Sequence, residues 1–502
     1  MTVIHAFRDR VRRALRPGAS TQIETDDEQR YRPIEWPLIR RLLSCLAPYR
    51  TLYITAMTFG LIHVMLEMLS PQFISAMINY ATAFATGDLS PTVTRPDAIR
   101  HALLIIGIWA GVFIVSVILQ RFTILFMTRA GESVQFDLRR RLFSHLQVLS
   151  MSFYDKTKLG RIISRCTSDV SSLREVNVWG IWRIVANALQ MILAAGMLLF
   201  TDWRLFLAVA WLGVALFLLN RAYLRRAMTM WQIAREGFTR VSTNLAENIT
   251  GMRVVTAFNR QDPNLGVFNN LQQINTANNV AVSRFSGIYQ ALLQVIGYAG
   301  KIILLTLGAY LFATGNLRGK GVGAVVAALL YWEWFMQPIL NFGDFYTQML
   351  MAMAGAERVF SLLDLKPEVQ DQPGAAALAR IVGHVRFESV TFGYNPERPV
   401  LHDIDFEARP GEMFALVGPT GGGKSSIISL IARFYQPQQG AVRVDEQDIR
   451  AVTGDSLHRQ MGLVLQVNYL FSGTVLDNIR YANPSATRDQ VIAAAKTLGS
   501  HE

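Results

Sequence analysis

The sequence predicts two kinds of domain in one chain: an all-α domain of six transmembrane helices, then an α/β domain that begins near residue 381. Three observations support this fold class. Apolar residues make up 51 % of the 502 residues and gather in blocks, while charged residues make up only 17 %, against a usual ~25 %. Lys and Arg are concentrated in alternate connections between the blocks. After the last block, an alternating strand pattern is followed by a glycine-rich loop. This composition excludes a disordered chain.

Six apolar blocks carry very few charges, and a helix that crosses a bilayer needs ~20 mainly apolar residues. Helices buried in a soluble core are the alternative interpretation, but six such blocks favour a membrane domain. The expected spans are residues 52–80, 102–119, 184–200, 205–219, 285–315 and 321–350, the third and fourth extended by flanking polar residues.

The distribution of Lys and Arg predicts the orientation of these spans. The N-terminal segment 1–50 and the connections 121–183 and 220–284 hold 10 + 11 + 8 = 29 basic residues. The other three connections, 81–98, 201–204 and 316–320, hold four in all. We therefore expect a cytoplasmic N-terminus and a cytoplasmic α/β domain. The net charge of +12 follows from this topology, so the bilayer is an expected partner and nucleic acid is not.

The remaining segments divide the chain further. The start, residues 1–18, is basic and amphipathic and lacks the long apolar region of a signal peptide. Residues 34–49 have apolar residues at helical spacing until Pro48, which predicts a short interfacial helix. The two cysteines, Cys45 and Cys166, are expected to be free thiols. The predicted boundaries are a cytoplasmic segment 1–50, a membrane domain 51–350, a linker 351–380 and an α/β domain 381–502.

Long helices are expected to continue from the spans into the two basic connections, because these contain many helix formers and little Pro or Gly. Gly160 and Gly251 are candidate bend positions. In the α/β domain, residues 385–394 alternate as a strand does, and residues 414–418, FALVG, predict a short buried strand.

The motif with the clearest chemistry lies in residues 418–425, GPTGGGKS, which fit the phosphate-binding pattern G-x-x-x-x-G-K-[ST]. The predicted strand precedes it and an apolar-periodic helix follows it, which is the context that the motif requires. Glycines let the backbone turn its N–H groups around a phosphate, and the helix N-terminus adds positive potential. Lys424 is expected to neutralise β/γ-phosphate charge, and Ser425 to bind magnesium.

Together with the phosphate-binding motif, residues ~35–502 resemble the ATP-binding cassette (ABC) exporters in their half-transporter form. Residues 153–170 and 247–262 resemble the family's two cytoplasmic loops, and residues 354–364 resemble its join to the nucleotide domain. A soluble P-loop kinase fused to a membrane anchor does not account for these loops. The resemblance implies that Tyr394 stacks on adenine and that Gln466 contacts magnesium and water.

The resemblance implies a subunit of an ATP-driven exporter of an amphipathic substrate (drug-like, lipid or peptide) in a bacterial inner membrane. It implies ATP and Mg²⁺ as ligands, and a second half-transporter subunit, identical or different, as partner. The residues expected to bind ATP are Tyr394, Gly418, Pro419, Thr420, Gly421, Gly422, Gly423, Lys424, Ser425, Ser426 and Gln466, with Ser425 and Gln466 also on the metal.

The sequence departs from the family after Gln466. The family's ATPase site needs an LSGGQ-like signature, a strand ending in an Asp-Glu pair and a switch histidine, and the 502 − 466 = 36 residues that follow contain none of these. His501 comes too early to be that histidine. Residues 381–502 therefore match the N-terminal half of a nucleotide-binding domain. We expect no hydrolysis by this chain alone, so the alternative function is a truncated, hydrolysis-incompetent membrane protein that binds ATP or accompanies a complete subunit.

Five ionisable residues lie inside the predicted spans, where charge is costly and often functional. They are His63, Glu67, Lys301, Glu333 and Asp344. One interpretation is a translocation cavity that favours cationic or zwitterionic substrates. The other is a structural ion pair between Lys301 and Glu333 or Asp344, and the sequence leaves both open.

Overall fold

The computed structural model describes residues 36–86, 95–317 and 321–501. These divide into two compact units. One comprises Met1–His145 and Gly160–Asp364, and the other comprises Leu146–Leu159 and Leu365–Glu502. The basic segment 1–18 lies outside the described residues.

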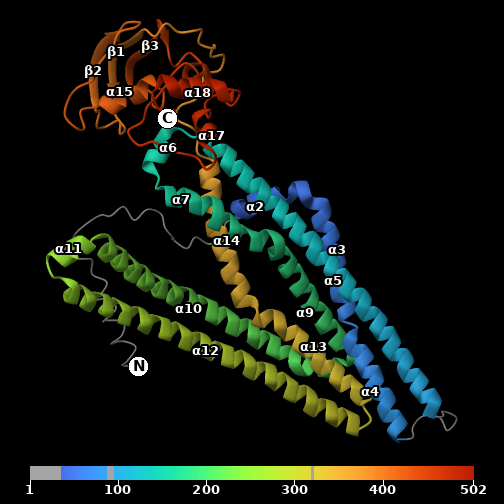
Figure 1. Ribbon diagram of the computed structural model, residues 1–502. Helices are drawn as coiled ribbons and strands as arrows, with labels where there is room; N and C mark the ends of the chain where they lie inside the picture. Colours follow the sequence, from blue (N-terminus) through green and yellow to red (C-terminus); the bar gives the residue numbers. More distant parts are fainter. Residues whose placement is uncertain (1–35, 87–94, 318–320, 502) are drawn as a thin grey trace. The chain divides into compact units, whose positions relative to one another are not determined.

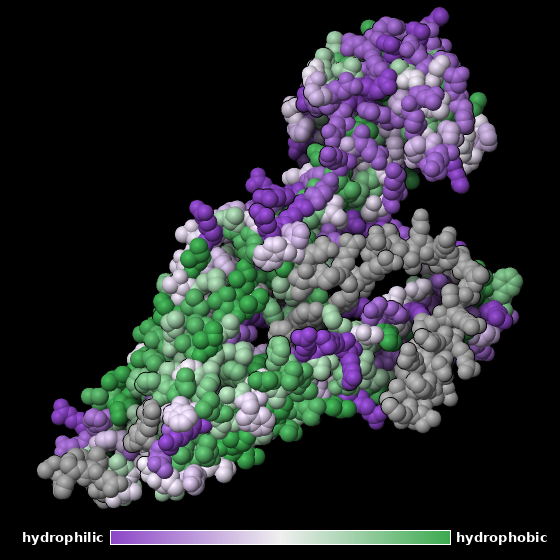
Figure 2. Space-filling view, turned by 180° about the vertical axis from the view of Figure 1, so that it is seen from behind, coloured by the Kyte–Doolittle hydropathy of each residue, from purple (hydrophilic) through white to green (hydrophobic). Residues whose placement is uncertain are grey.

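The first unit confirms the expected membrane domain. Among the described residues, six helical stretches are long and apolar enough to cross a bilayer. Hydrophobic side chains cover much of the outer surface of these helices (Figure 2). The stretches are built from α3 (Arg50–Glu67) with α4 (Ser70–Thr86), α5 (Arg95–Leu146), α9 (Ile181–Thr201), α10 (Trp203–Thr250), α12 (Gln261–Ala313) and α13 (Val322–Leu340).

Three helices are much longer than a span, as the sequence predicts. α5, α10 and α12 have 52, 48 and 53 residues, which at 1.5 Å per residue gives about 70–80 Å each, against a hydrocarbon core of ~30 Å. α10 and α12 run side by side (Figure 1), joined at one level by the stacked rings of Tyr223 and Tyr289. Gly251 ends α10 before the short α11 (Met252–Ala257). Gly160 lies inside α7 (Leu159–Ser164), just after the break at residues 157–158.

The expected helix before the first span is α2 (Trp36–Leu46), and it ends where Pro48 begins a 3₁₀ turn, η1 (Ala47–Tyr49). Arg41 fastens α2 to the distant α14 (Phe342–Leu363): its guanidinium donates two 2.6 Å hydrogen bonds to Asp364 and lies over the Phe360 ring. The hydrogen bonds from Arg41 hold the pKa of the Asp364 carboxyl below its usual range.

The third span is reached through an irregular helix. α7, η2 (Arg165–Asp169), α8 (Val170–Glu175) and η3 (Val176–Gly180) precede α9, and the two η segments are π-helical. Asp169 is buried there and accepts hydrogen bonds of 2.9 and 2.6 Å from Arg358 of α14. A buried carboxylate requires such a partner, so this pair anchors the π-helical segment to α14.

The sixth span is shorter than residues 321–350. α13 ends at Leu340, with Pro338 in its last turn, and α14 starts at Phe342. Proline removes a backbone donor and clashes with the preceding turn, which accounts for a break close to this point. Asp344 consequently lies in α14.

The second unit contains a four-stranded antiparallel sheet in the order β2-β1-β3-β4. Val385 of β1 lies opposite Ala408 of β2 and Val444 of β3. α15 (Lys424–Ile431) lies beside this sheet (Figure 1) and contributes Ile427 and Leu430 to the same hydrophobic core. The strands are β1 (Val385–Phe392), β2 (Leu401–Ala408), β3 (Gln439–Val444) and β4 (Gln447–Asp448), and β1 confirms the predicted strand.

The predicted buried strand at residues 414–418 is wrong. These residues adopt no strand, and Val417 is 89 % exposed. Phe414 does stack on Phe406, and Leu416 contacts the core. A strand is defined by hydrogen bonds to a neighbour, and none of the described strands pairs with this segment, so the apolar sequence alone does not make one.

A short helix from the connection between the second and third spans belongs to this second unit. α6 (Met151–Lys156) contacts the segment after α14: Ser150 accepts a 2.9 Å hydrogen bond from the Val369 N–H, and Lys156 lies 3.5 Å from Glu368. The unit is completed by α16 (Gly454–His458), α17 (Val475–Ile479) and α18 (Arg488–Thr497).

Candidate functional site

The glycine-rich loop has the backbone shape of a phosphate cradle. Gly418, Gly421 and Gly423 have φ values of 151°, 86° and 83°, which L side chains rarely adopt. Such a backbone directs successive N–H groups into one concavity. Gly423 caps the N-terminus of α15, and Lys424 is its first residue, so the positive end of the helix faces the loop.

The side chains around the loop fit ATP and magnesium. Lys424 Nζ donates to the carbonyl oxygens of Gly418 (2.9 Å) and Pro419 (2.7 Å), which holds the ammonium over the loop. Ser425 is exposed in the first turn of α15. A Cβ on Gly423 would lie 2.5 Å from Cδ2 of Leu401, so a larger residue here would have to displace the Leu401 side chain of β2. When bound, magnesium would neutralise phosphate charge beside Ser425.

Tyr394 lies beside this loop. Its hydroxyl is 3.1 Å from Oγ of Ser426, the residue after Ser425, and its ring meets Phe392 and Tyr435 edge-on. The side chain is 42 % exposed, so part of the ring is available to a flat ligand. Its assignment to adenine stays a prediction. Gln466 lies exposed in an irregular segment, and its assignment to magnesium likewise stays a prediction.

Tyr435 is a functional candidate that sequence reasoning missed. It is buried, packs against Tyr394, and donates a hydrogen bond to Asp155 of α6. Burial, followed by the hydrogen bond to Asp155, raises the pKa of the Tyr435 phenol above its usual range. Contacts therefore run from Ser426 beside the phosphate loop through Tyr394 and Tyr435 to α6. No spacing in the sequence relates Asp155 to Tyr435.

In the membrane unit, α12 and α13 bring Lys301 and Glu333 together, with 3.1 Å between Nζ and Oε2. The pair lines a cavity of about 210 Å³ whose polar wall also includes Gln294, Tyr298 and Gln337. These three residues were missed, although the signal was present: Gln294, Tyr298 and Lys301 are spaced i, i+4, i+7, and Glu333 and Gln337 are spaced i, i+4, which places each set on one helix face.

The other ionisable residues lie elsewhere. His63 and Glu67 are both on α3, 3.6 Å apart, and His63 Nδ1 also lies 2.7 Å from Oγ of the buried Ser116 on α5. Asp344 is on α14, and its side chain is outside the described residues. The five predicted residues therefore do not form one described cluster, and of the two partners considered for Lys301 the described residues show Glu333.

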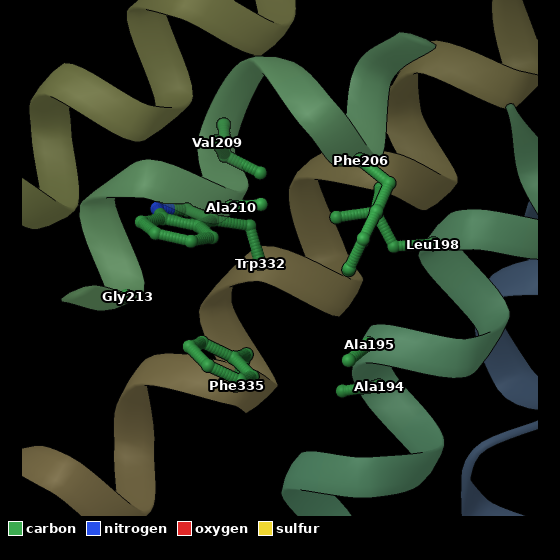
Figure 3. A pocket seen from close by; sticks show the side chains of 9 residues that line it. All are labelled: Ala194, Ala195, Leu198, Phe206, Val209, Ala210, Gly213, Trp332 and Phe335. Carbon is green, nitrogen blue, oxygen red and sulfur yellow. The ribbon is translucent and has the colours of Figure 1, made fainter. Parts of the chain in front are cut away.

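A second, larger cavity of about 460 Å³ lies on another face of α13, against α9, α10 and α14, and its wall is mostly apolar. A small apolar cavity of about 30 Å³ adjoins it at Gly213 and Phe335 and adjoins the polar cavity at Trp332. Figure 3 shows Trp332 and Phe335 extending from α13 toward side chains of α9 and α10. Their rings are stacked, with centroids 5.8 Å apart. α13 thus presents a polar and an apolar cavity separated by one aromatic pair.

A six-span membrane domain joined to a domain with a phosphate-binding loop defines a membrane protein of the nucleotide-dependent transporter class. Residues 53–339 match the ABC transporter transmembrane region, and residues 401–502 match the ABC transporter nucleotide domain. The chain belongs to the ABC transporter family, with the half-transporter arrangement that the resemblance implied.

Curated relatives align along most of the chain. An uncharacterized ABC transporter ATP-binding protein of Bacillus subtilis, YknV, is 30 % identical over 486 residues, covering 95 % of this chain and 77 % of that protein. An ATP-dependent lipid A-core flippase of Desulfotalea psychrophila is 28 % identical, covering 91 % and 77 %. A putative multidrug export ATP-binding/permease protein of Staphylococcus aureus is 28 % identical, covering 93 % and 79 %.

Proposed function

We propose that the chain is a subunit of an ATP-driven exporter that moves an amphipathic molecule out across a bacterial inner membrane. The observation that carries the proposal is α13, which presents a polar cavity with an ion pair on one face and an apolar cavity of about 460 Å³ on another. An amphipathic molecule offers a surface suited to each. The relatives named for multidrug export and for a lipid A-core flippase support this substrate class.

ATP is the proposed energy source, and Mg²⁺ is the proposed metal. The loop 418–425 surrounds the phosphates with backbone N–H groups, Lys424 compensates their charge, and Ser425 and Gln466 bind the metal. Tyr394 receives the adenine on its exposed face. The orientation follows from the 29 basic residues on one side of the spans, so both the N-terminus and the nucleotide domain face the cytoplasm.

A second half-transporter subunit is the proposed partner, identical or different. Two nucleotide domains would close on ATP and turn the membrane cavity outward. α6, which follows the long helix α5 along the chain, contacts the nucleotide domain through Asp155 and Tyr435.

A second candidate function rests on the sequence after Gln466. Residues 467–502 contain neither an LSGGQ-like run nor an Asp-Glu pair, and no carboxylate in them is proposed as the base that polarises the attacking water. The second candidate function is binding of Mg-ATP without hydrolysis, alone or beside a complete subunit.

Reconstitution distinguishes the two functions. The chain is placed in proteoliposomes with Mg-ATP and an amphipathic dye, ethidium, and both phosphate release and dye accumulation are measured beside Lys424→Ala. Accumulation and phosphate release that disappear in Lys424→Ala support the exporter. Nucleotide binding with phosphate release equal to that of Lys424→Ala supports the second function. Absence of nucleotide binding would contradict both.

A further inference from the structure

The ion pair between Lys301 and Glu333 is unusual for its surroundings. Lys301 is the only charged residue in 285–315, and an isolated charge in a span is costly. Pairing with Glu333 at 3.1 Å removes much of that cost. A pair with a purely structural role needs no access, yet the Lys301 and Glu333 side chains are 39 % and 49 % exposed and line a cavity.

The pair also has unused hydrogen-bonding capacity. An ammonium has three N–H donors, and a carboxylate accepts at two oxygens. Among the described residues, one Nζ to Oε2 hydrogen bond is found for the pair, together with the Tyr298 ring 5.9 Å from Nζ. The amides of Gln294 and Gln337 stand in the same cavity wall. The cavity therefore offers a cation, an anion and neutral hydrogen-bonding groups around one space.

Charge balance decides which ligand this arrangement accepts. A ligand that carries only a cation would pair with Glu333 and leave Lys301 uncompensated, and a ligand that carries only an anion would do the reverse. Leaving one partner of an ion pair without its counter-charge inside a membrane span is unfavourable. A ligand with both charges replaces the one internal pair by two pairs, so neither side chain loses its partner.

We infer that the cavity between α12 and α13 binds the headgroup of a zwitterionic amphiphile, with Lys301 on its anionic group and Glu333 on its primary ammonium. This inference rests on the proposed exporter function and narrows its substrate class. A volume of about 210 Å³ is about seven times the ~30 Å³ of one liquid water, which suits a group the size of phosphoethanolamine. A primary ammonium is favoured because it donates hydrogen bonds to Glu333.

The surface beside the cavity favours a lipid over a free zwitterion. Val295, Tyr298 and Ile302 of α12 are 62 %, 63 % and 64 % exposed, and Leu340 of α13 also lines the cavity. Acyl chains can rest on the three aliphatic side chains and on the ring of Tyr298 while the headgroup enters, and burial of their CH₂ groups adds to binding.

The test uses the full chain in nanodiscs with three lipids that share a photoreactive acyl chain: phosphatidylethanolamine, phosphatidylglycerol and a trimethylammonium lipid. Mass spectrometry quantifies labelling of peptides from α12 and α13. We expect the zwitterionic lipid to label these peptides about tenfold more than either singly charged lipid, a ratio that one charge-assisted hydrogen bond can supply. Soluble phosphoethanolamine at equal concentration should not displace it; displacement would refute the lipid and assign the site to a free zwitterion.

Two variants should invert this preference in opposite directions. Glu333→Gln leaves Lys301 unpaired and should favour phosphatidylglycerol, whereas Lys301→Met should favour the trimethylammonium lipid. Glu132→Gln is the matched control, because Glu132 forms a similar ion pair with Arg174 at 2.8 Å, with exposures of 49 % and 48 %, outside the cavity; it should keep the original preference.

Equal labelling by the three lipids, or loss of all three in both variants without inversion, would overturn the inference. Mg-ATP binding is measured on the same samples, because Lys424 is intact in every variant. Normal nucleotide binding with no lipid preference would refute only the zwitterionic headgroup, whereas loss of nucleotide binding in the unmodified chain would refute the proposed function itself.

Discussion

The hydrogen bond between Tyr435 and Asp155 yields a quantitative prediction, because removing one hydroxyl should loosen α6. Tyr435 is buried and donates to the Asp155 carboxylate, and hydrogen bonds to charged groups contribute roughly 1.5–3 kcal/mol. Asp155 is exposed, so water replaces part of the lost interaction, and we expect about 1–2 kcal/mol in Tyr435→Phe. That free energy corresponds to roughly 5- to 30-fold more frequent opening of α6.

Hydrogen exchange of the full chain measures this effect directly. Backbone amides of residues 151–156 should exchange about 5- to 30-fold faster in Tyr435→Phe when opening is in rapid equilibrium. Tyr394→Phe is the matched control, because it also removes a hydroxyl from the aromatic cluster, but that hydroxyl contacts Ser426. Unchanged exchange of α6 in Tyr435→Phe, or an equal increase in Tyr394→Phe, would refute the reasoning.

Three further substitutions have expected effects. Asp169→Asn should lower the free energy of unfolding by about 2 kcal/mol. This is less than the 3–5 kcal/mol of a fully buried pair, because the Arg358 side chain is 42 % exposed. A thermal unfolding temperature in detergent that falls no more than that of a surface variant would contradict this. Gly423→Ala should abolish Mg-ATP binding, because residue 423 has a φ of 83° and its new Cβ would approach Leu401; retained affinity would show that the cradle tolerates a side chain. Arg433→Met should lower the free energy of unfolding of the second unit by about 2–3 kcal/mol, since it leaves the Val452 and Gln370 carbonyls without their donor. Unaltered protease resistance of the second unit would contradict this expectation.

Much of the membrane unit follows from the sequence because the bilayer imposes a simple requirement. Each span must be apolar over ~20 residues, so composition locates all six stretches that the structure confirms. The break at Asn341 was missed, although Pro338 just before it is a helix breaker, because the expected span 321–350 rested on its small number of charged residues, Glu333 and Asp344. Hydropathy indicates which residues can lie in the bilayer, but it does not indicate where a helix breaks.

A candidate site could be predicted from the sequence where its residues are adjacent in the chain. The loop 418–425 is one continuous motif, so its glycine geometry follows from adjacent residues. The contact between Asp155 and Tyr435 spans 280 positions, and no local pattern indicates it. Residues 414–418 show the opposite error: FALVG has the composition of a buried strand, but burial depends on a neighbouring strand that a sequence window does not contain.

The central claim is that residues 418–425 of this chain hold the phosphates of ATP. Equilibrium binding of Mg-ATP to the full chain tests it most directly, with Lys424→Ala as the site variant and Lys496→Ala, an exposed lysine of α18, as the control. We expect saturable binding that weakens at least about tenfold in Lys424→Ala, since a charge-assisted hydrogen bond contributes roughly this much. Binding should be unchanged in Lys496→Ala. Equal affinity of the unmodified chain and Lys424→Ala, or no binding by either, would contradict it.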